Sequence, residues 1–253
     1  YYDGRFSNGP VAAEYLAAGL GLANSPAYKN LAVAGAKTGT GGQLEGTGML
    51  KQTEGLLTEM PALPSGALYV VWGGANDLRG GVGIGEAVGN LASIVTQLHA
   101  AGARNFLLPN LPDLGLTPEA LENGPNASAM ATGASNLFNA TLAGAYAGLA
   151  AQWSDEQFYA FNAMAAQKAI ITGSPDNGFS NVEDRCFDAR VFSLCANPGS
   201  YLYWDNIHPT AAAHQILGGQ MLAAVPEPAS MLMMAVGVAA LLGLGRRRVG
   251  AAA

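Results

Sequence analysis

The sequence predicts an α/β domain in which a mostly parallel sheet carries helices on both faces. Three observations lead to this fold class. Short apolar runs alternate with helical stretches along the chain, which is typical of strand–helix–strand units. Half of the 253 residues are hydrophobic, so the chain can bury a large core. Glycines and polar residues follow several apolar runs directly, at the sheet edge where open α/β sheets bind ligands.

The first part of the chain predicts a helix, a short strand and a second helix. A helix is expected at 11–20 because Pro10 precedes it and proline favours the first turn. The apolar run at 31–34 predicts a strand that ends at Gly35. Residues 43–60 predict another helix, which the glycines inside it weaken.

The remaining elements include the clearest strand of the sequence, at 67–72. Its residues are apolar, β-branched or aromatic, and two glycines end it. The stretch 84–101 predicts an amphipathic helix, because its leucine, isoleucine and valine residues fall on one face. After it we expect a strand at 104–109, a helix at 126–151, a strand at 158–161, a helix at 162–171, an irregular stretch at 173–203 and a last helix at 210–223.

Charge and composition exclude one class of partner. The formal net charge is −6, only 12% of the residues are charged, and basic residues are scattered except at 246–248. A nucleic-acid surface needs a basic stripe that neutralises phosphates, so no nucleic-acid partner is expected. The 34 glycines and 13 prolines indicate a loop-rich domain, but they follow no collagen-like period.

The chain has two cysteines, Cys186 and Cys195. Neither belongs to a Cys/His spacing typical of zinc, so no metal site is predicted. The cysteines can be two separate buried thiols, or they can form one disulfide that closes a short loop. The disulfide is favoured because the C-terminal segment described below indicates export from the cytoplasm.

Asp205 and His208 lie just before the last predicted helix. A carboxylate can orient an imidazole, which can then act as a general base toward a hydroxyl group. The alternative is structural, with Asp205 at the helix start and His208 as an ordinary loop histidine. His99 and His214 fall in predicted helices, and we interpret both as surface or packing residues.

Gly35 and Asn76 each follow a predicted strand. A glycine lets its backbone N–H approach a ligand closely, and an asparagine amide can stabilise a developing oxyanion. The alternative for each is an ordinary turn. Asp77 is interpreted as structural support for the turn around Asn76.

The four candidates occur in a specific order along the chain: Gly35, then Asn76, then Asp205 and His208. This order resembles that of the SGNH/GDSL hydrolase family, and in particular its branch of secreted bacterial esterases and lipases. Other segments that look like this branch are Gly4-Arg5-Phe6-Ser7-Asn8-Gly9-Pro10, Gly102-Ala103-Arg104, Pro109-Asn110-Leu111-Pro112-Asp113-Leu114-Gly115, Phe138-Asn139 and Tyr203-Trp204-Asp205.

The resemblance implies a three-layer, flavodoxin-like parallel sheet and an ester hydrolase that needs no metal or organic cofactor. A serine attacks the ester carbonyl, His208 takes and returns the proton, and Asp205 holds His208. Gly35 and Asn76 form the oxyanion hole. The expected substrates are lipid, acyl or acetylated-carbohydrate esters.

The sequence departs from the family at the nucleophile. The Gly-Asp-Ser motif is expected before Gly4 but does not occur, and no G-x-S-x-G replaces it. Ser7 is an alternative nucleophile, although the resemblance places it in the loop after the catalytic serine. We expect the catalytic serine and the first strand to be missing from the N-terminus, and the chain as given to be inactive and poorly stable.

The C-terminus carries a second recognisable pattern. Val225-Pro226-Glu227-Pro228 precedes an apolar stretch at 229–245 and then three arginines, which fit a short membrane span with a cytoplasmic stop. This pattern resembles the PEP-CTERM sorting signal of Gram-negative bacteria. It implies export, transient inner-membrane anchoring by 229–245, cleavage by an exosortase-type enzyme, and a final place in the cell envelope or outside the cell.

The expected organisation is therefore a hydrolase domain at 1–224, a sorting signal at 225–248 and a tail at 249–253. Two functions remain open at this point. The first is an exported serine esterase or lipase. The second is a catalytically inert envelope or biofilm-matrix protein that keeps only the fold. The sequence before Tyr1 and an esterase assay would distinguish them.

Overall fold

The computed structural model describes residues 1–174 and 176–225. Its centre is a parallel sheet of β1 (Leu68–Val70), β2 (Asn105–Pro109) and β3 (Gln157–Phe161), in the order β1-β2-β3. The connections between these strands run through helices, as parallel pairing requires. The predicted α/β class is thereby confirmed.

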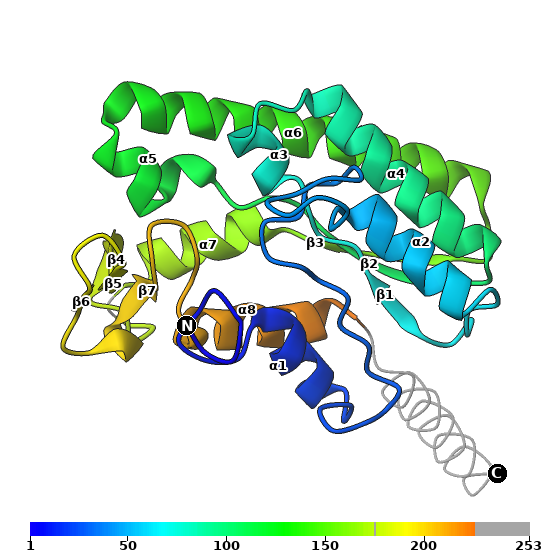
Figure 1. Cartoon of the computed structure of the whole chain (residues 1–253), viewed down its shortest axis with the longest axis horizontal. Coiled ribbons are helices and arrows are strands. Elements are labelled where there is room, and N and C mark those ends of the chain that lie inside the picture. Colours follow the sequence, from blue (N-terminus) through cyan, green and yellow to red (C-terminus); the bar gives the residue numbers. More distant parts are fainter. Residues whose placement is uncertain (175, 226–253) are drawn as a thin grey trace, which may run out of the picture.

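Helices cover both faces of the sheet (Figure 1). On one face lie α2 (Met49–Glu59), α4 (Ile84–Ala100) and α6 (Pro125–Gln152). On the other face lie α1 (Ala12–Gly19), α7 (Ala163–Thr172) and α8 (Ala211–Ala224). The result is the three-layer arrangement expected for this class.

The central strand β2 supplies both halves of the core. Phe106 and Leu108 belong to the cluster under α4 and α6, whereas Leu107 belongs to the cluster under α1, α7 and α8. This alternation follows from the two-residue period of a strand. Phe106 also pairs in register with Phe158 of β3, and the two rings stack with their centroids 5.5 Å apart.

Helices α1 and α8 join the two ends of the domain through a close contact. A Cβ atom on Gly218 would lie 2.5 Å from the Cβ of Tyr15 and 2.8 Å from the carbonyl oxygen of Ala12. Only glycine lets the two backbones approach so closely. This contact fixes α8, which begins just after the candidate residues Asp205 and His208.

One prediction about the first part of the chain is wrong, and another places the start of a helix too early. Residues 31–34 form no strand, and Leu31 and Val33 are exposed. No described strand lies beside this segment, so its backbone has no ladder partner to make it a strand. The helix expected at 43–60 begins only at Met49, because Gly46, with a φ of 74°, and Gly48 lie in the preceding turns.

The stretch predicted as irregular at 173–203 contains four short strands. β4 (Asn181–Arg185) pairs with β7 (Tyr201–Tyr203), and β5 (Phe187–Asp188) forms a hairpin with β6 (Ser193–Leu194). A disulfide joins Cys186 and Cys195 across the hairpin, with their Cα atoms 4.8 Å apart. Two short helices were not predicted either, namely α3 (Ala75–Arg79) and α5 (Pro118–Glu122).

The candidate membrane segment at 229–245 lies outside the described residues. Within 1–174 and 176–225, none of the helices combines the length and apolar character needed to cross a membrane.

Candidate active site

The carboxylate of Asp205 and the imidazole of His208 are hydrogen bonded. Nδ1 of His208 lies 2.9 Å from each carboxylate oxygen. Because a carboxylate only accepts hydrogen bonds, Nδ1 carries the proton of the neutral ring, and Nε2 keeps a free lone pair. This pair has the geometry of a general base with its orienting acid.

The chain around Asp205 holds the pair in place. Its Oδ1 accepts hydrogen bonds from the backbone N–H groups of Ile207, at 3.0 Å, and His208, at 2.8 Å. The hydroxyl of Tyr1 donates to Oδ2 at 3.0 Å. Burial acts to raise the pKa of Asp205, but the bonds from His208 and the backbone outweigh it and hold that pKa below its usual value. Asp205 therefore stays ionised beside the imidazole.

Asn76 lies in the first turn of α3, directly after the glycines that follow β1. Its Nδ2 donates one hydrogen bond to the carbonyl oxygen of Ala36 at 2.9 Å, which leaves the second amide hydrogen for a ligand. Gly35 precedes Ala36 with a φ of 76°, a value that favours glycine. Its backbone N–H donates to no group among the described residues.

A buried carboxylate joins the two segments that carry Gly35 and Asn76. Asp77 is fully buried and accepts hydrogen bonds from both the backbone N–H and the hydroxyl of Thr38. A carboxylate without such partners would be costly to bury. Asp77 thus fixes the loop at 35–38 against α3, in keeping with its predicted structural role.

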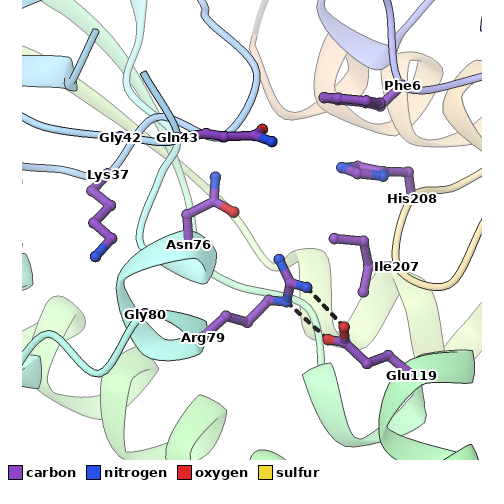
Figure 2. A pocket seen from close by; sticks show the side chains of 11 residues that line it. Phe6, Lys37, Gly42, Gln43, Asn76, Arg79, Gly80, Glu119, Ile207 and His208 are labelled. Atoms are coloured by element: carbon purple, nitrogen blue, oxygen red, sulfur yellow. Dashed lines mark hydrogen bonds and ion pairs between the residues drawn. The ribbon is translucent and has the colours of Figure 1, made fainter. Parts of the chain in front are cut away.

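Gly35, Asn76 and His208 line one cavity of about 600 Å³ (Figure 2). Figure 2 shows His208 beneath Phe6 on one side, with Gln43 and Asn76 on the other. The rings of Phe6 and His208 stack with centroids 4.8 Å apart. Asp205 lies outside this cavity and lines a neighbouring one of about 290 Å³. The structure thus brings together residues that are far apart in sequence.

Sequence reasoning missed a group that ties the two sides of the cavity together. Glu119 of α5 accepts hydrogen bonds from the Arg79 guanidinium at 2.8 and 2.9 Å (Figure 2). Its Oε1 also accepts from the side chain of Asn206 at 3.1 Å. Arg79 holds the pKa of Glu119 below its usual range. No sequence motif indicated this group, because its members come from three separate segments.

Replacing Glu119 with glutamine is expected to lower kcat/KM of the full-length protein about 10- to 100-fold, because the loop of His208 then loses its anchor to α3. Stability should fall by less than about 1 kcal/mol, since the ion pair is partly exposed. Steady-state kinetics and thermal unfolding measure both. The matched control is Glu54→Gln, which removes an exposed ion pair with Lys51 on α2. Equal activity of the two variants would contradict this role.

No serine among the described residues lines the cavity. Ser7, the alternative nucleophile, is fully buried and donates its hydroxyl to the carbonyl oxygen of Pro209 at 3.0 Å. Ser7 therefore does not present its hydroxyl to the cavity. In this position it holds the N-terminal loop against the residue that follows His208.

His99, Asp155 and Glu156 form the single cluster of possible metal ligands among the described residues, with ligand atoms within 4.8 Å of one another. Nε2 of His99 lies 2.5 Å from Oε1 of Glu156. Nε of Arg104 lies 3.2 Å from the Asp155 carboxylate and 3.6 Å from that of Glu156. Because the guanidinium already supplies the positive charge, we interpret the cluster as ion pairing at the amino ends of β2 and β3.

The protein family that the sequence matches shows how the cavity should be interpreted. Residues 1–221 match the family described as GDSL-like lipase/acylhydrolase. The chain belongs to this family. Residues 224–248 match the PEP-CTERM protein-sorting motif, which marks proteins for export in Gram-negative bacteria. Both matches confirm the family resemblances inferred from the sequence.

The chain is also similar to several named proteins. The chain is 28% identical to the thermolabile hemolysin of Vibrio parahaemolyticus, over 88% of this chain and 56% of that protein. It is 27% identical to the phosphatidylcholine-sterol acyltransferase of Aeromonas hydrophila, over 91% and 80% respectively. It is also 27% identical to the GDSL esterase/lipase APG of Arabidopsis thaliana, over 53% and 43%. The chain spans about half the length of the hemolysin and of APG.

The burial of the His214 imidazole predicts that the stability of this GDSL-family chain depends on pH. Its Nδ1 is shielded from solvent without a hydrogen-bond partner among the described residues. Burial, with the nearby His208, lowers its pKa from 6.5 to about 4, and Glu14 opposes this shift. Between pH 4 and pH 6.5, His214 is therefore protonated in the unfolded chain but not in the folded one. The stability of the folded chain is highest above pH 6.5 and falls as the pH drops to about 4.

The expected loss is about 2 kcal/mol, a figure reduced from the full shift because the ring is partly exposed. Urea unfolding at pH 7 and pH 4.5 should show this loss, and the His214→Leu variant should lose correspondingly less. If the variant and the wild type lost the same stability, His214 would not be the group responsible.

Proposed function

We propose that this chain carries most of the active site of an exported serine esterase or lipase that hydrolyses carboxylic esters. The observation that carries the proposal is the convergence of Gly35, Asn76 and His208 on one cavity, with Asp205 bonded to the far side of the imidazole. The family match and the relatives named esterase/lipase support ester hydrolysis.

In the proposed mechanism, His208 removes the proton from a serine hydroxyl as the oxygen attacks the ester carbonyl. The Gly35 N–H and the free amide hydrogen of Asn76 stabilise the oxyanion that forms. His208 then returns the proton to the departing alcohol, which leaves an acyl-serine. Water hydrolyses this acyl-enzyme in a second, equivalent step.

The nucleophile of this mechanism is a serine that lies outside residues 1–253. Three observations support this assignment. No described serine lines the cavity, and Ser7 is buried and engaged with Pro209. Nε2 of His208 has no hydrogen-bond partner among the described residues, so it is free to receive the serine hydroxyl.

The experiment is an assay of the full-length gene product on p-nitrophenyl acetate and on p-nitrophenyl esters of longer acyl chains. The proposal predicts hydrolysis of at least one ester, and the profile across chain lengths defines the acyl preference. A folded full-length protein that hydrolyses none of them would favour the alternative, an inert envelope or matrix protein that retains only the fold.

The proposed organisation is a hydrolase domain at 1–224, a sorting signal at 225–248 and a short tail at 249–253. The sorting motif at 224–248 supports recognition by an exosortase-type enzyme. We propose that the apolar stretch at 229–245 anchors the protein in the inner membrane until cleavage near Pro226-Glu227-Pro228 releases it to the envelope or the medium.

Cleavage predicts that the mature protein lacks residues 229–253. Intact-mass measurement on protein purified from its native host should give a C-terminus near the Pro-Glu-Pro sequence. Deletion of the host exosortase should restore the full C-terminal mass, which is the control. Detection of the complete tail in protein from the unmodified host would contradict the prediction.

A further inference from the structure

The hairpin of β5 and β6 exposes a cluster of apolar side chains at its tip. Val191 is 69% exposed, Phe192 is 85% exposed and Leu194 is 60% exposed. Single exposed apolar residues are common on protein surfaces, but three within four positions concentrate apolar surface at one tip, and such surface often marks an interaction site. We call these three residues the apolar tip.

The stem of the hairpin is rigid, so the apolar tip cannot fold back onto the domain. The disulfide between Cys186 and Cys195 closes the stem, and the backbone N–H of Cys195 also donates to the carbonyl oxygen of Cys186 at 2.7 Å. Phe187 stacks on Trp204 with ring centroids 5.4 Å apart. Phe192 has a φ of 51°, a conformation that a bulky residue adopts only at a cost.

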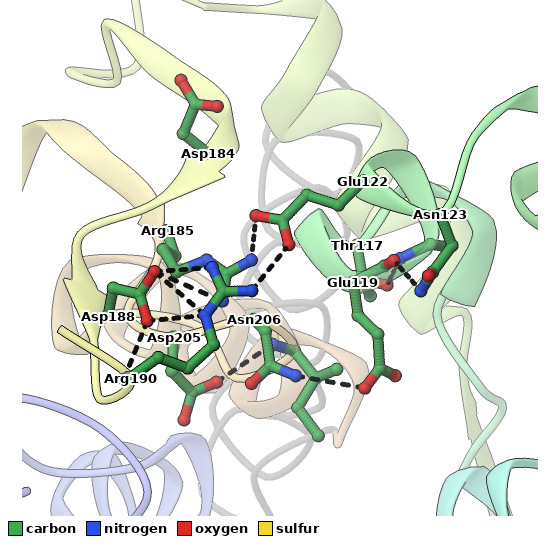
Figure 3. A network of polar contacts seen from close by, with 12 residues as sticks. Thr117, Glu119, Glu122, Asn123, Asp184, Arg185, Asp188, Arg190, Asp205 and Asn206 are labelled. Carbon is green, nitrogen blue, oxygen red and sulfur yellow. Dashed lines mark hydrogen bonds and ion pairs between the residues drawn. The ribbon is translucent and has the colours of Figure 1, made fainter.

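The two arginines at the stem are fully paired with carboxylates. Arg185 and Arg190 both pair with Glu122 of α5 and with Asp188 of the hairpin (Figure 3). Two further carboxylates, at 183–184 of β4, are exposed beside the stem. An anionic surface would be repelled by these carboxylates, and both arginines are already paired. A surface without net charge fits this surrounding.

The stem also has a fixed relation to the catalytic loop. The backbone N–H of Phe187 donates to the carbonyl oxygen of Trp204, the residue before Asp205, at 2.7 Å. Helix α5 links the same two regions, because Glu122 holds the arginines of the stem while Glu119, one turn earlier, holds Arg79 at the cavity. Whatever the apolar tip binds is therefore held at a constant position relative to the cavity.

We propose that the apolar tip inserts into the surface of a zwitterionic or neutral lipid layer and so places the cavity at the surface where ester substrates are exposed. Only the placement of the cavity near ester substrates rests on the proposed function, whereas insertion of the apolar tip does not. A lipid layer accepts a small apolar protrusion without a complementary shape, and a layer without net charge does not repel the carboxylates beside the stem. The apolar tip leaves the chemical reaction as proposed. It favours esters held in a lipid layer over esters dissolved in water.

Insertion can be measured directly with a tryptophan at the apolar tip. The full-length Phe192→Trp variant is mixed with vesicles of brominated phosphatidylcholine, which quench tryptophan only where it enters the bilayer. After subtraction of the wild-type signal, the added tryptophan should be quenched about twofold or more relative to the same probe at Met130→Trp. Met130 is 75% exposed on α6 and serves as the matched control. Equal quenching of the two probes would overturn the proposal and favour a protein partner.

The consequence for activity is tested with polar substitutions. The double variant Val191→Ser/Phe192→Ser should hydrolyse an ester in phosphatidylcholine vesicles about tenfold more slowly or worse, and dissolved p-nitrophenyl acetate at an unchanged rate. Met130→Ser/Leu137→Ser is the control. Equal losses on both substrates would mean a structural role and overturn the proposal. Quenching needs no hydrolysis, so an inert protein that still inserts would refute the esterase function alone.

Discussion

Replacement of His208 by alanine is expected to lower kcat for p-nitrophenyl ester hydrolysis by about 10³- to 10⁶-fold in the full-length protein. Among the described residues that line the cavity, the imidazole is the base with a free lone pair, because Asp205 occupies its Nδ1 and Nε2 is free. The other carboxylate there, Glu119, is paired with Arg79. Stopped-flow or steady-state assays measure the change. Thermal unfolding should be little altered, since the ring is partly exposed.

The companion variant Asp205→Asn separates orientation from proton transfer. An amide can donate to Nδ1, which favours the tautomer with the proton on Nε2 and removes the base. We expect a loss of about 10⁴-fold in kcat with an intact fold. The control for both is His99→Ala, at the opposite end of the sheet, which should keep kcat at a temperature where it is folded. Full activity of His208→Ala would contradict the assignment.

Replacement of Asn76 by alanine tests the other half of the site, the oxyanion hole. Loss of one oxyanion donor is expected to lower kcat by about 10²- to 10³-fold with a small change in KM, because the hydrogen bond strengthens only as charge develops on the carbonyl oxygen. Asn76→Asp should be worse than alanine, since a carboxylate repels the oxyanion while keeping the size of the side chain. Steady-state kinetics separates kcat from KM.

Asn76 also holds the carbonyl oxygen of Ala36, so its loss has a structural component. Asn105→Ala is the matched control, because Asn105 likewise donates its amide to a backbone carbonyl, that of Ser65, at the amino end of β2 and away from the cavity. A loss of stability in both variants with a loss of kcat in Asn76→Ala alone supports the oxyanion role. If kcat fell equally in the two variants, Asn76 would be a structural residue only.

Much of the layered fold could be predicted because its elements are periodic. The amphipathic pattern that predicted a helix at 84–101 corresponds to α4, whose buried residues lie on one face. The run at 104–109 corresponds to β2, which is buried almost throughout. Such patterns arise because the buried face of a helix or strand carries apolar side chains, which can be recognised in the sequence.

Other parts depend on partners that local sequence does not reveal. The run at 31–34 looks like a strand, but a strand exists only beside another, and the described residues supply none for it. Helices α3 and α5 are too short to show a period, although Thr117 and Pro118 give α5 a recognisable start. The hairpin of β5 and β6 was not predicted, although the disulfide that closes it was favoured from the sequence.

Some residues of the candidate site could likewise be predicted from the sequence, and others could not. Gly35, Asn76, Asp205 and His208 could be proposed from sequence because each lies next to a predicted element and all four fit a family order. The group formed by Arg79, Glu119 and Asn206 could not, since its contacts join three distant segments. Phe6, which stacks on His208, was recognised only as part of a motif.

The central claim is that these four residues complete their site with a serine from outside residues 1–253. It is tested most directly by reaction of the native protein with a fluorophosphonate, followed by peptide mapping of the adduct. We predict one labelled serine, in a peptide preceding Tyr1, and no labelling in the His208→Ala variant. A label on Ser7 or any other serine within 1–253, or labelling that persists without the imidazole, would contradict the claim.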